Sequence, residues 1–215
     1  MTLESSLPWI SVAAALAAGV FAGGIRPSSA ETGLKALALA ALAMFAYFRG
    51  VAPAAVAQAL VLGAIAQALA PRGVQRFATA GVLFLAAAWL VFAYLFFRTG
   101  GGQGAPFTDP VRTVLLVCVL SGVAFVARRT RREGRRARTG ALADLAALTL
   151  VAWGALTLPW TFWPAMAGTA AVLAGEALLM ETLRPDAPET GPLVRRAAWT
   201  LSYLGLAAMA YPFLR

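Results

Sequence analysis

The fold of this chain is decided by a stretch near its C-terminus, AAVLAGEALLMETLRP (Ala170–Pro185). Its first eleven residues are apolar or small except for one carboxylic acid, Glu176. Such a segment is typical of a helix inside a bilayer, where an acidic side chain costs roughly 2.5–3.5 kcal/mol on insertion scales. Because of that cost, Glu176 is a candidate functional residue, and it needs partners from elsewhere in the chain.

The composition of the whole chain also indicates a membrane protein. Of its 215 residues, 60% are hydrophobic and 13% are charged, whereas soluble domains are about half apolar and about 25% charged. The chain has no histidine and one cysteine. These counts exclude a histidine-dependent triad, an internal disulfide and the usual zinc sites. No cofactor or metal is expected.

Eight apolar segments come close to the roughly 20 residues that a helix needs to cross a bilayer core of about 30 Å. They predict an all-α polytopic membrane protein with a single transmembrane domain over residues 1–215. The first segment follows Glu4 and no basic region, so it is predicted to be a span and not a cleaved signal peptide. The predicted spans are Pro8–Gly24, Gly33–Phe48, Val51–Ala70, Phe77–Phe97, Pro110–Ala127, Gly140–Leu158, Phe162–Leu183 and Val194–Leu214.

Lysine and arginine are shared unequally between the two sides that eight spans create. One side receives 14 of the 18 basic residues, including the loop RRTRREGRRAR (Arg128–Arg138), and the other receives Arg49, Arg98, Arg112 and Arg215. The positive-inside rule makes the richer side cytoplasmic. We therefore expect a bacterial inner-membrane protein with both termini in the periplasm. The arginine loop is interpreted as a topology signal that attracts anionic lipid, and nucleic-acid binding is not expected because no aromatic or polar readout residues are interleaved.

Two parts of the chain match at a shift of 109 residues. Lys35 then falls on Asp144, and Gln67 falls on Glu176. The match predicts two parallel half-repeats of four spans each, roughly residues 1–108 and 109–215. At a rise of 1.5 Å per residue, Gln67, Asp144 and Glu176 lie about 7–10 Å from the cytoplasmic ends of their spans, and Lys35 lies close to the same interface.

These four polar residues have two possible roles. As a site between the halves, they would bring together two carboxylates, an amide and an ammonium, and the two acids would titrate in separate steps. As structural contacts, Lys35 and Asp144 would form an ion pair, and Gln67 and Glu176 an interhelical hydrogen bond. The sequence leaves both roles open.

The aromatic residues of the last five spans are predicted to be mostly lipid-facing or interfacial, with a minority lining an acyl-chain cavity. They are Trp89, Phe92, Tyr94, Trp153, Trp160, Trp163, Trp199, Tyr203 and Tyr211.

The order and spacing of these elements resemble the YhhN-like family of bacterial membrane proteins, which is related to animal lysoplasmalogenases. The resemblance covers most of the chain. It rests on GLKALALAALAMF around Lys35, VLGAIAQALA around Gln67, GVLFLAAAWLVFAYLF around Trp89, AGTAAVLAGEALLMETL around Glu176, and YLGLAAMAY from Tyr203.

The resemblance implies an enzyme that hydrolyses the vinyl ether of a lysoplasmalogen and releases a fatty aldehyde and a glycerophospho-alcohol. It implies that Glu176 donates a proton and that Asp144 stabilises the oxocarbenium ion or activates water. Lys35 and the cytoplasmic arginines would hold the phosphate. Trp89 and Tyr203 would contact the substrate.

The chain departs from the family pattern at three positions. The family has Gly-Asp where this chain has Ala66-Gln67, Ser-Asp where it has Gly175-Glu176, and a histidine where it has Trp89. Gln67 completes the predicted catalytic set, but its amide does not exchange a proton at neutral pH. Two other functions therefore stay open: a non-catalytic lipid-binding or accessory subunit of a larger membrane complex, and a small transporter. Membrane lipid is the expected partner, together with other membrane subunits if the chain is an accessory protein.

Overall fold

The computed structural model describes residues 3–21, 28–49, 54–69, 75–100, 107, 109–130, 135–182 and 192–214. Over these residues the chain is all-α, as predicted, with eight long helices, two short 3₁₀ turns and no strand. The elements are α1 (Leu3–Phe21), α2 (Ser29–Arg49), α3 (Ala54–Leu69), α4 (Gln75–Gly100), α6 (Pro110–Thr130), α7 (Arg135–Thr157), η1 (Trp160–Phe162), α8 (Trp163–Thr182), α9 (Pro192–Ala210) and η2 (Tyr211–Phe213).

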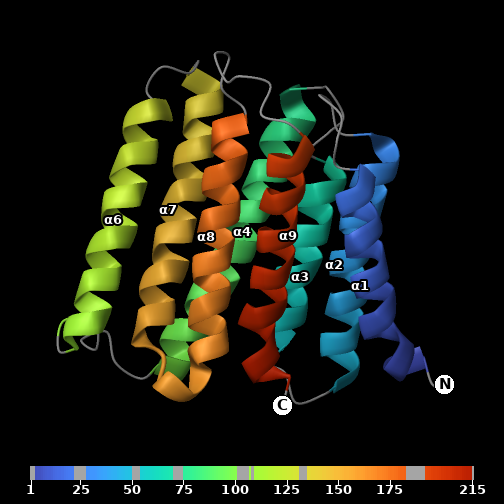
Figure 1. Cartoon of the computed structure of the whole chain (residues 1–215), viewed down its shortest axis with the longest axis horizontal. Coiled ribbons are helices and arrows are strands. Elements are labelled where there is room, and N and C mark those ends of the chain that lie inside the picture. Colours follow the sequence, from blue (N-terminus) through green and yellow to red (C-terminus); the bar gives the residue numbers. More distant parts are fainter. Residues whose placement is uncertain are drawn as a thin grey trace.

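Successive helices run in opposite directions and lie side by side as a bundle (Figure 1). Both termini lie at the same end, the lower one in Figure 1, which we call the terminal end. The opposite end is the one where α7 begins at Arg135 and α9 begins at Pro192, and we call it the arginine end. Part of the predicted arginine loop is helical, because α6 continues to Thr130 and α7 already starts at Arg135. Residues 131–134 lie outside the described part of the chain.

Prolines set several of the helix boundaries. Both α6 and α9 begin with a proline, Pro110 and Pro192. A backbone N–H in the first helical turn has no partner within the helix, so proline, which lacks this N–H, is well suited to that position. Pro159 has an extended backbone with φ −58° and ψ 152°. It ends α7 at Thr157 and starts the η1 turn, which reverses the chain into α8.

Among the described residues, three helical segments are long and apolar enough to cross a membrane by themselves: Ser29–Arg49, Thr79–Gly100 and Trp160–Leu179. Four further segments are apolar but shorter, namely Ser5–Phe21, Ala54–Leu69, Pro110–Ser121 and Leu142–Thr157. The membrane character predicted from composition is supported to this extent. The number of spans stays a prediction.

When the two halves of the chain are compared at a shift of 109 residues, their helices begin and end at similar positions, but these helices pack differently. α1 to α4 pack on one another in chain order, whereas α6 lies at the edge of the bundle with limited contact to α7 (Figure 1). The halves meet mainly through α4 and α7, and to a lesser extent through α1 and α9. In a parallel repeat, α9 and α2 would correspond to α4 and α7. In the described part of the chain, however, α9 and α2 have no contact comparable to that of α4 and α7. The parallel repeat therefore stays a prediction.

Glycines allow α8 and α9 to touch backbone to backbone. A Cβ atom at Gly168 would lie 2.5 Å from the carbonyl oxygen of Gly205, and one at Gly205 would lie 2.6 Å from that of Gly168. A Cβ atom at Gly175 would lie 2.5 Å from the hydroxyl of Ser202. Small residues that permit such close approach are common where membrane helices pack. This contact fixes the position of Glu176, which follows Gly175 directly.

The core is more aromatic than the sequence led us to expect. The prediction of lipid-facing or interfacial aromatics is wrong for four residues that are buried: Trp89, Phe92, Trp199 and Tyr203. α4 lies between α3 and α7, and its aromatic face therefore fills the centre of the bundle. Four others are exposed, as the prediction requires: Tyr94, Trp160, Trp163 and Tyr211.

Candidate functional site

Two carboxyl groups from neighbouring helices form the centre of the candidate site. Asp144 of α7 is buried, and Glu176 of α8 is partly exposed. The two groups are close enough to interact electrostatically, and we call them the carboxyl pair. Because α7 and α8 are antiparallel, Asp144 in the first half of α7 and Glu176 near the end of α8 both lie in the half of the bundle nearer the arginine end. The two acids therefore lie in the same half of the bundle, and their depth in a membrane stays a prediction.

Asp144 is held by an indole from the other half of the chain. Trp89 Nε1 donates a hydrogen bond of 3.1 Å to Asp144 Oδ1, and Trp89 is 1% exposed. The bond crosses the α4–α7 contact. A buried carboxylate needs hydrogen-bond donors to offset its lost hydration, so Trp89 supports the acid directly. The sequence predicted Trp89 as a substrate contact and did not reveal this bond.

Glu176 differs from Asp144 in its surroundings. Among the described residues, no side chain donates a hydrogen bond to Glu176 or forms an ion pair with it. Among the described residues, the charged group that acts on Glu176 is the other carboxyl, that of Asp144. Two adjacent acids can hold a single proton between them, and this arrangement is suited to acid–base chemistry.

A second group of polar side chains, which we call the lysine cluster, consists of Glu31, Lys35 and Trp199. Lys35 Nζ donates to Glu31 Oε1 at 2.6 Å, and it lies 5.0 Å from the centroid of the Trp199 ring. Glu31 is buried, and Trp199 Nε1 donates to the carbonyl of Ala15 at 3.0 Å. Lys35 thus has its carboxylate partner on its own helix, and the alternative of an ion pair between Lys35 and Asp144 is wrong. The spacing of four residues between Glu31 and Lys35, which favours such a pair on a helix, is the sequence signal that was missed.

Tyr203 lies beside the lysine cluster, with its ring centroid 5.9 Å from that of Trp199. Its hydroxyl is 2.7 Å from the Ser11 hydroxyl, which in turn donates to the carbonyl of Ala38 at 2.7 Å. These bonds join α9, α1 and α2. The structure therefore gives Tyr203 a structural contact, and its predicted contact with substrate stays a prediction.

Gln67 is not brought to the carboxyl pair by helix packing. It is partly exposed near the end of α3, and α3 packs on α2 and α4 while α8 packs on α9 and α7. No hydrogen bond between Gln67 and either acid occurs among the described residues. The predicted hydrogen bond between Gln67 and Glu176 is absent from this part of the structure.

Two surface hollows lie away from both polar groups. One, of about 330 Å³, is lined by Ala55, Tyr94, Leu95, Arg98 and Thr99. The other, of about 160 Å³, is lined by Thr161, Phe162, Pro164, Tyr211 and Pro212. Within the described ranges, no cluster of three or more cysteine or acidic side chains is arranged to hold a metal ion.

The fold and the site together define a class of protein. It is an all-α bundle of apolar helices with two interacting acids in the half nearer the arginine end. No family model, curated protein or solved structure matches the chain. The resemblance seen in the sequence therefore stays a prediction, and evidence for a function has to come from the site itself.

Proposed function

We propose that this chain is an eight-span integral membrane protein that hydrolyses the vinyl ether bond of a lysophospholipid. The observation that carries the proposal is the carboxyl pair, in which Asp144 is fixed by Trp89 and Glu176 has no other described partner. The resemblance to lysoplasmalogenases supplies the substrate class. Membrane lipid then surrounds the protein and also provides its substrate.

Exposed side chains support membrane insertion of helices beyond the three longest apolar segments. α1 exposes Leu16 and Val20, each at 67%, and α6 exposes Val114 at 62%. Large apolar patches on a monomer mark a surface that something apolar covers, and acyl chains would cover these. We propose that the remaining helices also span the bilayer.

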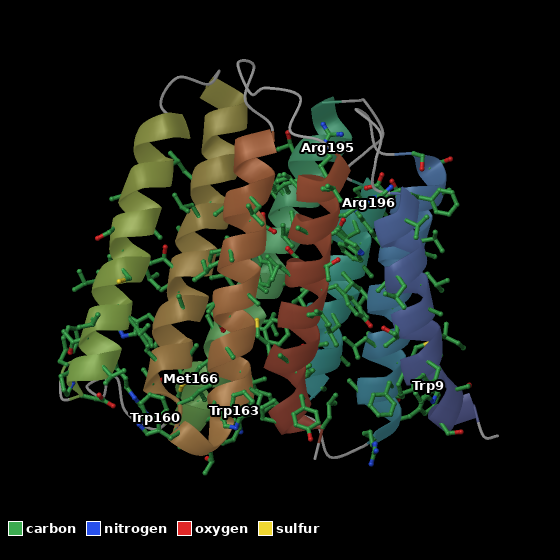
Figure 2. The ribbon with its side chains drawn as sticks, in the orientation of Figure 1. Trp9, Trp160, Trp163, Met166, Arg195 and Arg196 are labelled. Atoms are coloured by element: carbon green, nitrogen blue, oxygen red, sulfur yellow. The ribbon has the colours of Figure 1, made fainter. Side chains whose placement is uncertain are left out.

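The two ends of the bundle differ in the way that the two faces of a membrane require. Trp9, Trp160 and Trp163 are exposed near the terminal end, whereas Arg195 and Arg196 lie near the arginine end (Figure 2). Tryptophan favours the membrane interface, and arginine is enriched on the cytoplasmic side. This polarity supports a bacterial inner-membrane location with both termini in the periplasm.

The chemistry can be written with the two acids alone. Glu176 donates its proton to the outer carbon of the vinyl ether, and the C=C π bond becomes a C–H bond and an oxocarbenium ion. Asp144 stabilises this cation and accepts a proton from the water that adds to it. The resulting hemiacetal loses its hydroxyl proton as its C–O bond breaks to give a fatty aldehyde, and the leaving oxygen of the glycerophospho-alcohol takes up that proton. Transfer of the proton from Asp144 back to Glu176 restores the site.

Lys35 and arginines of the arginine end would bind the substrate phosphate in this proposal. An ammonium has three N–H donors, and one of those on Lys35 is engaged by Glu31. Lys35 lies on α2, and its side chain is 18% exposed. A phosphate bound at the arginine end would place the vinyl ether of the same lipid toward the half of the bundle that holds the carboxyl pair.

The decisive experiment follows aldehyde release from a lysoplasmalogen by the purified protein. Glu176→Gln removes the proton donor while keeping the size of the side chain, and we expect it to lower turnover at least about 100-fold. Asp109→Asn is the matched control, because it makes the same chemical change at the terminal end, where Asp109 pairs with Arg112 at 3.3 Å. The control should retain turnover within about threefold, the effect of a carboxylate outside the acid–base pair. Absence of aldehyde with the folded wild type, or equal loss in both variants, would refute the proposal.

A second candidate is a non-catalytic accessory subunit of a membrane complex. It is favoured by the position of Gln67 away from the carboxyl pair and by the limited contact of α6 with α7, which leaves Val111, Val114 and Val117 exposed. Purification in a mild detergent tests it. A stable membrane partner together with no aldehyde release would favour this function over hydrolysis.

A further inference from the structure

The larger hollow lies at the terminal end, between α3 and α4 and away from the carboxyl pair. Its volume of about 330 Å³ is within the range of small-molecule sites. Ala55 and Leu95 contribute apolar surface, and Tyr94 contributes a ring that is 59% exposed. Among the described residues that line this hollow, none is acidic and one, Arg98, carries a guanidinium. The lining therefore fits an anion attached to an apolar group.

Arg98 is available to a ligand in a way that the other described arginines at this end are not. Arg112 is buried against the carbonyl of Leu156 at 2.8 Å and against Asp109, and Arg49 lies 5.3 Å from the Phe45 ring. Arg98 is exposed, and within the described part of the chain it has no ion pair or hydrogen bond. Its guanidinium can therefore offer a two-pronged set of donors, which suits phosphate.

The position of Arg98 along α4 favours a lipid over a soluble anion. Arg98 is at the end of Thr79–Gly100, which has a mean hydropathy of 2.3, the highest of the three long apolar segments. The end of such a segment lies at the membrane interface, where the phosphates of phospholipids are located. Thr99 adds no free hydroxyl hydrogen, because its Oγ1 donates to the Leu95 carbonyl at 2.8 Å.

We propose that this hollow binds a phospholipid, with its phosphate on Arg98 and the start of an acyl chain against Ala55 and Leu95. The proposal rests on the proposed membrane insertion, and it does not depend on hydrolysis at the carboxyl pair. It assigns a bound lipid to the end of the bundle that has few basic residues.

Native mass spectrometry of the full chain in mild detergent tests the site with three probes: phosphatidylglycerol, diacylglycerol and inorganic phosphate. We expect the wild type to retain phosphatidylglycerol, and Arg98→Ala to weaken its binding about tenfold, the value of one charge-assisted hydrogen bond. Arg98→Lys should lose about threefold, because an ammonium cannot make the forked contact. Arg49→Ala is the matched control and should bind as the wild type does.

Three results would overturn the proposal. Equal binding of phosphatidylglycerol by wild type and Arg98→Ala would show that the lipid sits elsewhere, and equal binding of diacylglycerol would show that the phosphate is not recognised. Inorganic phosphate binding as tightly as phosphatidylglycerol would assign the site to a soluble anion instead. Ala55→Trp gives a second route, since it fills the hollow while keeping Arg98 and should displace the lipid.

Carbonate extraction of membranes separates failure of this site from failure of membrane insertion. Variants that stay in the membrane but bind lipid equally refute the lipid site alone. Release of the wild type from the membrane would refute both the site and the proposed function.

Discussion

In the lysine cluster, buried Glu31 accepts a hydrogen bond of 2.6 Å from Lys35, and the ammonium also lies over the Trp199 ring. In the carboxyl pair, the charged neighbour of Glu176 is a second acid, Asp144. The first group satisfies its charges internally, as expected of side chains that stabilise helix packing. The second has no cation among the described residues, and burying a charged carboxyl such as that of Asp144 without one is expensive. The difference supports the proposal that the carboxyl pair is the group with a chemical role.

Three substitutions test this difference, and Asp144→Asn should have the largest effect of the three. The amide keeps an oxygen for Trp89 but cannot take a proton from water. We expect turnover of the lysoplasmalogen to fall about 100-fold while the chain stays folded. Aldehyde release and thermal unfolding of the same preparation give the two values. Loss of both together would make Asp144 a structural residue and remove the contrast between the two groups.

A smaller effect is expected from Trp89→Phe, which removes the N–H donor and retains an aromatic ring. Asp144 then loses its described hydrogen bond, and we expect turnover to fall about tenfold, with a change in the pH profile of the rate. A merely structural tryptophan would alter stability and leave the pH profile unchanged. The profile of Trp89→Phe against that of the wild type therefore decides the role of the indole.

The smallest effect on turnover is expected from Glu31→Gln in the lysine cluster. It replaces the carboxylate partner of Lys35 by an amide, and we expect a loss of about 1 kcal/mol in stability. The Michaelis constant should change by no more than a few fold, and the maximal rate should not change with it. Denaturation curves and steady-state kinetics check these values. A loss of maximal rate as large as that of Asp144→Asn would mean that the two groups act as one site.

The sequence predicted the shared level of Asp144 and Glu176 along the bundle better than it predicted their neighbours. Distance along a helix follows from the 1.5 Å rise, so the similar depths of Asp144 and Glu176 could be anticipated. The direction in which a side chain points can be predicted only for a helix with distinct polar and apolar faces, and the helices α3 and α8 have no such pair of faces. The sequence therefore could not tell that Gln67 lies away from Glu176.

The sequence could not predict the Trp89–Asp144 hydrogen bond, and the reason is a different one. Its two residues are 55 positions apart, and they meet because α4 packs on α7. No local pattern encodes that contact between the halves. The helices themselves were predictable because apolar length alone determines them.

The contact between α4 and α7 also affects the order in which the helices pack during folding. Trp89 is synthesised before Asp144, and its indole N–H has no acceptor from α7 until that helix docks. The α8–α9 hairpin, by contrast, joins helices that follow each other in the chain and meet through Gly168 and Gly205. Local pairs of helices can therefore form early, whereas the supported acid exists only after both halves have joined. The proposed hydrolysis would therefore require both halves of the chain to have joined.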